Sequence, residues 1–156
     1  KLSLLKDLKE DQFTVMTQED ILDSIQSILN MLTIALASIS GISLLVGGIG
    51  IMNIMLVSVA ERTKEIGLRK ALGATSSDIR NQFMAEAILI SSLGGLVGLL
   101  LGWVATILIK PLIQAVIPVW AIPLALGFSI AVGIIFGTYP AVNASKKDPI
   151  EALRYE

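Results

Sequence analysis

Three long stretches without any charged side chain dominate this sequence. They lie between Asp23 and Glu61, between Glu86 and Lys110, and between Lys110 and Lys146. A helix that crosses the hydrocarbon core of a bilayer needs about 20 apolar residues. Each stretch is long enough for one crossing, and three such stretches within 156 residues are not expected of a water-soluble globule. The charge pattern therefore predicts three transmembrane helices.

The composition supports a membrane protein and excludes several other classes. Hydrophobic residues make up 54% of the chain and charged residues 16%, whereas soluble domains carry about 25% charged residues. The near balance of 12 basic and 13 acidic residues removes the electrostatic case for a nucleic-acid partner. Since the sequence has no cysteine and no histidine, we expect no disulfide, no imidazole base, no metal site and no catalytic residue. The first residue is Lys1 rather than Met, so we expect the chain to be one piece of a longer polypeptide.

Basic residues near the ends of the spans predict the orientation. Segment 61–86 carries five lysines and arginines and the tail carries three, but the connector between the second and third spans has Lys110 alone. Cytoplasmic loops of membrane proteins carry an excess of these residues. The N-terminal lysines, Lys1, Lys6 and Lys9, lie far from the first span and beside six acidic residues. We therefore expect a multi-pass protein of the cytoplasmic membrane, with segment 61–86 and the C-terminus inside and the N-terminus outside.

The predicted fold class is an all-α membrane protein with three transmembrane helices, the first extended outward as a stalk. A short charged helix joins the first two spans on the cytoplasmic side. The last charge-free stretch begins with a connector rather than a helix, because prolines occur at positions 111, 118 and 123. The expected segments are the end of an extracytoplasmic domain (1–16), the stalk and first transmembrane helix (17–60), the short helix (61–74), the second transmembrane helix (75–109), an extracytoplasmic connector (110–120), the third transmembrane helix (121–144) and a cytoplasmic tail (145–156).

An apolar stripe before the first span predicts a helix that stands clear of the membrane. Residues 12–16 have the pattern of a short strand, and Thr17 with Asp20 resembles a capping box. A single helix from about residue 18 to 60 would be about 65 Å long, against about 30 Å of hydrocarbon. The alternative is an amphipathic segment that lies flat on the membrane surface. The stripe consists of Ile21, Leu22, Ile25, Ile28, Leu29 and Leu32.

Small residues at four-residue spacing predict close contacts between helices. Such residues allow two backbones to approach where lipid provides no hydrophobic driving force. The second span carries Gly94, Gly98 and Gly102, and the third carries Gly133 and Gly137 within a longer ridge. The contacts would form within this chain or with a second copy.

The spans contain no charged side chain that would serve a self-powered carrier. Ion-driven carriers place ionisable groups or broken helices near the middle of the membrane. Asn53 is the strongest polar group in the spans, and we expect it to form an interhelical hydrogen bond. If the protein moves a substrate, the energy comes from elsewhere.

The segment between the first two spans predicts a short helix followed by a tight turn. Glu65 and Arg69 stand four residues apart in the favourable order for a helical ion pair. Gly73 is expected to end this helix, and Thr75 with Asp78 offers a capping box for the next one. An ordinary solvated loop is the alternative.

Two blocks of the sequence resemble the permease of macrolide-exporter-type ABC transporters, the MacB-like family. The first block is residues 47–74, GGIGIMNIMLVSVAERTKEIGLRKALGA, and the second runs from Tyr139-Pro140-Ala141 to the Asp148-Pro149-Ile150-Glu151-Ala152-Leu153-Arg154 tail. The resemblance covers most of the chain after residue 17. It implies that the chain is the C-terminal part of such a permease and holds its last three transmembrane helices. The family's first span and most of its extracytoplasmic domain are missing, which is the main departure. In the tail, Asp148 and Pro149 also have the order of an N-cap and first residue of a final short helix.

The resemblance also implies a mechanism and a set of partners. Members of this family form permease dimers, sit in the lipid bilayer and take their energy from an ABC ATPase subunit or domain, with an extracytoplasmic adaptor protein outside. ATP and Mg²⁺ would be bound by that ATPase, and this chain contains no GxxxxGK[ST] loop and would bind no cofactor itself. Motion of the ATPase would be relayed along the stalk to the extracytoplasmic part. The residues that the resemblance assigns to coupling with the ATPase are Glu61, Arg62, Lys64, Glu65, Gly67, Arg69, Lys70 and Gly73.

The predicted function is the permease subunit of an ATP-driven exporter of drugs, peptides or other amphiphiles. One alternative is a regulatory transducer of the same architecture that controls a cell-wall hydrolase outside the cell, and a lipoprotein-extracting permease is another. A plain membrane anchor without an ATPase partner is the third.

Overall fold

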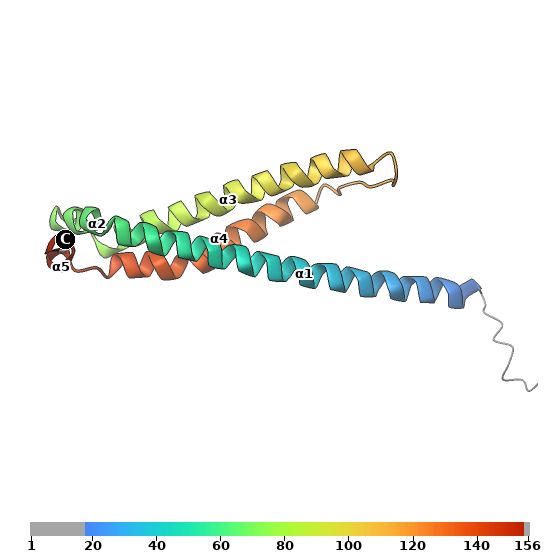
Figure 1. Ribbon diagram of the computed structural model, residues 1–156, viewed down its shortest axis with the longest axis horizontal. Coiled ribbons are helices and arrows are strands. Elements are labelled where there is room, and N and C mark those ends of the chain that lie inside the picture. The colour runs from blue at the N-terminus through green and yellow to red at the C-terminus, as the bar shows by residue number, and fades with distance from the viewer. Residues whose placement is uncertain (1–17, 155–156) are drawn as a thin grey trace, which may run out of the picture. The chain divides into compact units, whose positions relative to one another are not determined.

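The computed structural model describes residues 18–154, which form helices joined by short connections (Figure 1). The expected strand at 12–16 and the Thr17 cap lie outside the described residues. The described part contains no strand. Its helices are α1 (Gln18–Glu61), α2 (Thr63–Ala71), α3 (Ser76–Ile109), α4 (Ala121–Ser145) and α5 (Pro149–Arg154).

Three of these helices, α1, α3 and α4, are long and apolar enough to cross a membrane. They confirm the predicted all-α membrane fold, and they indicate a multi-pass membrane protein. The chain divides into two compact units, residues 1–42 and 43–156, which are described separately here.

The described part of the first unit is the N-terminal portion of α1. Its hydroxyl side chains donate hydrogen bonds to backbone carbonyls one turn earlier, so their polar groups are satisfied within the helix. The apolar side chains of the predicted stripe are exposed within this unit. The hydrogen bonds run from Ser24 to Asp20, Thr33 to Leu29, Ser38 to Ile34 and Ser40 to Leu36, at 2.7 to 2.8 Å.

In the second unit, α3 and α4 pack against each other through small residues. A Cβ added to Gly137 would lie 2.4 Å from Cβ of Ala87, and one added to Gly133 would meet the side chain of Ser91. The Ser129 hydroxyl donates to the carbonyl oxygen of Ser91. The two backbones therefore approach as closely as glycine allows.

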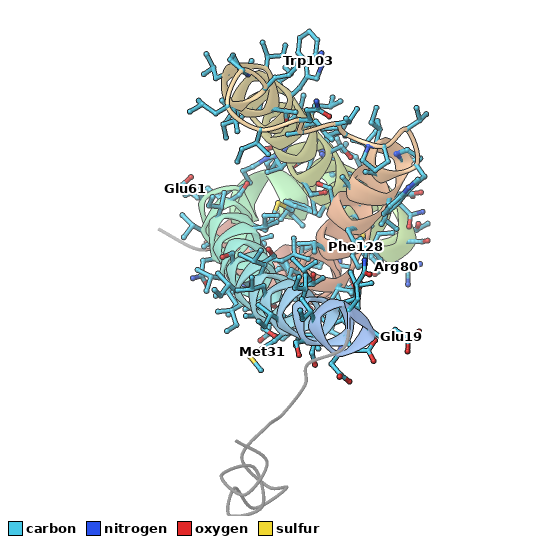
Figure 2. All side chains as sticks on the ribbon, turned by 90° about the vertical axis from the view of Figure 1, so that its right-hand side faces the viewer. Glu19, Met31, Glu61, Arg80, Trp103 and Phe128 are labelled. Atoms are coloured by element: carbon cyan, nitrogen blue, oxygen red, sulfur yellow. The ribbon has the colours of Figure 1, made fainter. Side chains whose placement is uncertain are left out.

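The core of the second unit lies where α1 ends, α3 begins and α4 ends, beside α2 and α5 (Figure 1). Toward the other end, most large apolar side chains of α3 and α4 point outward, as Trp103 does in Figure 2. Those exposed residues suit a lipid environment. The buried cluster consists of Met55, Val59, Ile66, Ile79, Phe83, Ala87, Ala141 and Ala144.

Candidate functional site

The candidate site is built around α2, whose ends are set by the local sequence. Gly73 adopts a φ of +103°, which side chains with a Cβ rarely accept. Its N–H donates to the carbonyl of Lys70 at 3.0 Å, which completes the last turn. Thr75 and Asp78 then form the predicted capping box, which starts α3. The turn between α2 and α3 is therefore encoded in six consecutive residues, 73–78.

Arg62, between α1 and α2, forms ion pairs with two helices. Its Nε donates to Glu65 Oε2 at 2.9 Å, and its Nη1 donates to Glu86 Oε1 and Oε2 at 3.0 and 3.1 Å. The guanidinium carbon lies 5.4 Å from the centre of the Phe83 ring, within the range of a cation–π contact. Arg62 thus joins α2 to α3.

Arg69 extends the same network along α2. Its guanidinium donates to Glu65 on its own helix and to the amide oxygen of Gln82 on α3. The Gln82 amide nitrogen donates to Glu86 Oε1 at 3.3 Å, which closes the network. The helical ion pair predicted between Glu65 and Arg69 is confirmed.

The network shifts the pKa values of two of its members, Glu65 and Arg62. The hydrogen bond from Arg62 is the main cause that holds the pKa of Glu65 below its ordinary value, and the charges of Arg62 and Arg69 add to it. Hydrogen bonds to Glu65 and then Glu86 raise the pKa of Arg62 above its ordinary value. Glu65 and Arg62 are therefore both charged at neutral pH.

Lys70 binds to the end of α4. Its Nζ donates to the backbone carbonyls of Ser145 at 2.6 Å and Lys147 at 2.8 Å. The last carbonyls of a helix have no partner within the helix and carry the negative end of its dipole, so a cation is favourable there. This contact joins α2 to the connection between α4 and α5.

Gly67 receives α5. A Cβ at position 67 would lie 2.7 Å from Cβ of Ala152, and Ala152 is 2% exposed. The carboxylate of Asp148 accepts a hydrogen bond from the N–H of Ile150 at 2.7 Å, as expected of an N-cap. Helices α2 and α5 thus pack through two small residues.

The outer face of α2 is apolar. Leu68 and Leu72 are 53% and 80% exposed, and Ala71 and Lys64 lie exposed on the same side of the helix. Glu61 is exposed just before α2. The sequence pattern predicts apolar contacts for the two leucines and does not place them among the coupling residues, but in the structure both are exposed. Their spacing of four residues shows that they lie on one side of the helix. It does not show whether that side faces the rest of the protein or points away from it.

The predicted coupling residues therefore fall into two groups. Arg62, Glu65, Arg69 and Lys70 make contacts within this chain, while Glu61 and Lys64 are exposed. Gly67 contacts α5 and Gly73 forms the turn, as described above.

The predicted packing glycines also divide into two groups. Gly133 and Gly137 face α3, but Gly94, Gly98 and Gly102 have open space where a Cβ would stand. These three line a cavity of about 550 Å³ within the second unit, together with residues of α1 and α4. Gly95, next to this row, is the α3 glycine that contacts Ser129.

Asn53 is exposed and makes no hydrogen bond to another helix within the described chain.

The acidic side chains of the described residues form no group that could hold a metal ion. The site is instead a set of basic, acidic and amide groups that connect helices. Ion pairs and hydrogen bonds hold α2 to α3 and to the end of α4, and Leu68 and Leu72 remain exposed.

Comparison with known proteins assigns the chain to a family of membrane proteins. Residues 37–149 match the family described as FtsX-like permease C-terminal. The chain is 54% identical over 148 residues, 94% of its length, to the macrolide export ATP-binding/permease protein MacB of Bdellovibrio bacteriovorus, of which it covers 23%. It is 48% identical over 149 residues to the uncharacterized ABC transporter permease YknZ of Bacillus subtilis, of which it covers 38%. The chain thus spans less than half the length of these relatives.

Proposed function

Since the chain belongs to the FtsX-like permease C-terminal family, we propose that it is the membrane part of an ABC transporter permease driven by ATP hydrolysis on a partner subunit or domain. The Bacillus subtilis relative is an ABC transporter permease by name, and the MacB relative is an ATP-binding/permease protein by name. The resemblance of residues 47–74 to macrolide-exporter-type permeases supports the same proposal.

The apolar face formed by Leu68 and Ala71 of α2 and by Leu72, the residue that follows the helix, is the surface that we propose for the ATPase. Large apolar side chains exposed outside a membrane-spanning segment mark a surface for a protein partner. Glu65 and Arg69 pair with each other, and Arg69 also donates to Gln82 on α3. Lys70 donates to backbone carbonyls at and just after the end of α4, so Lys64 is the charged side chain of α2 that is left exposed beside the leucines. This division of the helix is the observation that carries the proposal.

The orientation follows from the charge distribution. Segment 61–86 carries five basic residues, and the connector after α3 carries Lys110 alone. The α2 side of the second unit then faces the cytoplasm, where ATP is available. The N-terminal end of α1 faces the outside.

The mechanism that we propose is mechanotransmission. ATP-driven closure of two ATPase domains would displace α2, and α1 would carry this displacement outward through its continuous run of 44 helical residues. No charged group interrupts residues 24–60, so nothing in this segment offers a charged path for a substrate. Drugs, peptides or other amphiphiles would be moved by an extracytoplasmic domain, with a second permease copy and an adaptor protein as partners.

The test is ATP hydrolysis by the full-length protein with its ATPase in lipid, in wild type and in Leu68→Asp and Leu72→Asp variants. A carboxylate on the apolar face should abolish both ATPase binding and stimulation, because it buries an unpaired charge in the interface. Leu112→Asp is the matched control, since Leu112 is 84% exposed in the connector after α3. Wild-type binding by both α2 variants would contradict the proposed surface. Hydrolysis that responds to an extracellular protein rather than to amphiphiles would favour the regulatory transducer.

A further inference from the structure

The tail of the chain contacts α2 through Gly67 and Lys70, which are not the residues that bind α3. We propose that α5 and Lys70 form a brace that sets the orientation of α2 for its ATPase, with Lys70, Gly67 and Ala152 as positioning residues. This inference rests on the proposed function, and it assigns to the C-terminal helix a role in coupling.

Lys70 is placed to support α2 rather than to meet a partner. Two of its three ammonium protons are used by the carbonyls of Ser145 and Lys147. These acceptors lie 75 and 77 residues further along the chain, so the contact joins two distant segments. Since one acceptor ends α4 and the other precedes α5, Lys70 fixes the bend between these helices.

Gly67 and Ala152 form a contact that tolerates no extra atom. The hypothetical Gly67 Cβ would overlap Cβ of Ala152 and would also lie 3.4 Å from the carbonyl oxygen of Pro149. Both residues are buried. The distance between α2 and α5 is therefore set by the absence of a side chain at position 67.

A helix as short as α2 needs such external support. Isolated helices of fewer than about 12 residues are marginal in water, and α2 has 9. Its N-terminal end is held to α3 by Arg62, and its other side is held by Lys70 and α5. With both sides held, a force on the exposed Leu68 face moves the start of α3 and the end of α4 together. Without the brace, α2 would turn about its contacts with α3 and the force would be lost.

The first test exchanges one methyl group between α2 and α5 in the full-length protein with its ATPase. Gly67→Ala creates the overlap, and the double variant Gly67→Ala/Ala152→Gly removes it. We expect permease-stimulated ATP hydrolysis to fall by about five-fold or more in Gly67→Ala, the lower end of a typical coupling between two sites, and to return in the double variant. Equal stimulation in Gly67→Ala and wild type would overturn the brace, as would a double variant as defective as Gly67→Ala.

The second test addresses Lys70 by itself. Lys70→Met removes the donors and should lower stimulation while the ATPase still co-purifies, and Lys70→Arg should restore it because a guanidinium also donates to carbonyls. Lys146→Met is the matched control, since Lys146 is exposed and makes its described contacts through its backbone. Equal loss in Lys146→Met, or none in Lys70→Met, would contradict the proposal.

The brace and the proposed function fail in distinguishable ways. If the wild-type protein binds no ATPase, the proposed function is wrong, and hydrogen exchange of the α2 amides then tests the brace alone. Faster exchange in Gly67→Ala and Lys70→Met, with recovery in the double variant, would support the brace without any ATPase. Unchanged exchange in all variants would overturn it.

Discussion

Arg62 and Glu86 are 24 residues apart in the sequence, and one guanidinium nitrogen of Arg62 donates to both carboxylate oxygens of Glu86. The pair joins the two ends of the segment that contains α2 and the turn at Gly73. Both side chains are about one third exposed, so the pair lies neither in bulk water nor in a dry core. It connects the end of the first predicted span to the start of the second.

The Arg62–Glu86 pair should contribute to stability through coupling rather than through either charge alone. In a double-mutant cycle of Arg62→Gln and Glu86→Gln, we expect an interaction free energy of about 0.5–3 kcal/mol, as for residues in one network. Thermal unfolding of the purified protein in detergent measures it. Lys64→Gln with Glu86→Gln is the control pair and should show additive effects. Additive effects of Arg62→Gln and Glu86→Gln would mean that the ion pair adds nothing to stability.

The network should also make stability depend on pH in the acid range. The pKa of Glu65 is lower in the folded protein than its ordinary value of 4.5, mainly because Arg62 donates to it. The stabilisation is therefore complete above pH 4.5 and is lost as the pH falls through the lowered pKa. Unfolding temperatures measured from pH 7 to pH 3 should show a loss in wild type that is smaller in Glu65→Gln. The same acid dependence in both proteins would assign it to other groups.

The two glycine rows should respond differently to added side chains. Gly137→Val places atoms against Ala87 and should destabilise the α3–α4 contact by about 1–3 kcal/mol. Gly98→Val is the matched control and should leave the stability of a single chain unchanged, because nothing described lies within 4 Å of its Cβ position. If the Gly94–Gly98–Gly102 row contacts a second copy, Gly98→Val should weaken the dimer, and light scattering in detergent measures this. A Gly98→Val protein as unstable as Gly137→Val would contradict the described packing.

The turn after α2 should be sensitive to the residue at position 73. Gly73→Ala forces a Cβ into a conformation with φ of +103°, which costs about 1–2 kcal/mol. Gly73→Asn should cost less, because asparagine tolerates positive φ better than alanine does. Both effects are measurable as shifts in the unfolding temperature. Equal stability of the glycine and alanine proteins would show that the turn relaxes to a negative φ.

The helices and their caps were predictable because their signals are local. The charge-free stretches indicate three long apolar helices, and the structure has them as α1, α3 and α4. The Thr75–Asp78 box and the Asp148 cap depend on residues two or three positions apart, so spacing alone predicts them. The orientation of the spans, the role of α2 and the dimer remain predictions.

Apart from the Glu65–Arg69 pair on one helix, the partners of the charged residues were not predictable, because they depend on contacts across the sequence. A lysine in a charged segment has the same pattern whether it meets water, an ATPase or the end of α4. Lys70 was assigned to a surface for the ATPase, and in the fold its ammonium binds the carbonyls that end α4. Likewise, nothing in the glycine spacing shows that Gly133 and Gly137 pack against α3 while Gly94, Gly98 and Gly102 do not.

The sequence by itself determined which segments of this protein are helical and apolar, because hydropathy, spacing and capping act over a few residues. Only the tertiary structure decided which side of α2 faces outward. Arg62, Glu65 and Arg69 find partners toward α3, Lys70 and Gly67 find theirs at the end of α4 and at α5, and Leu68 and Leu72 are left exposed. Arg62 meets Glu86, and Lys70 meets the carbonyls that end α4, only because the fold brings these distant segments together.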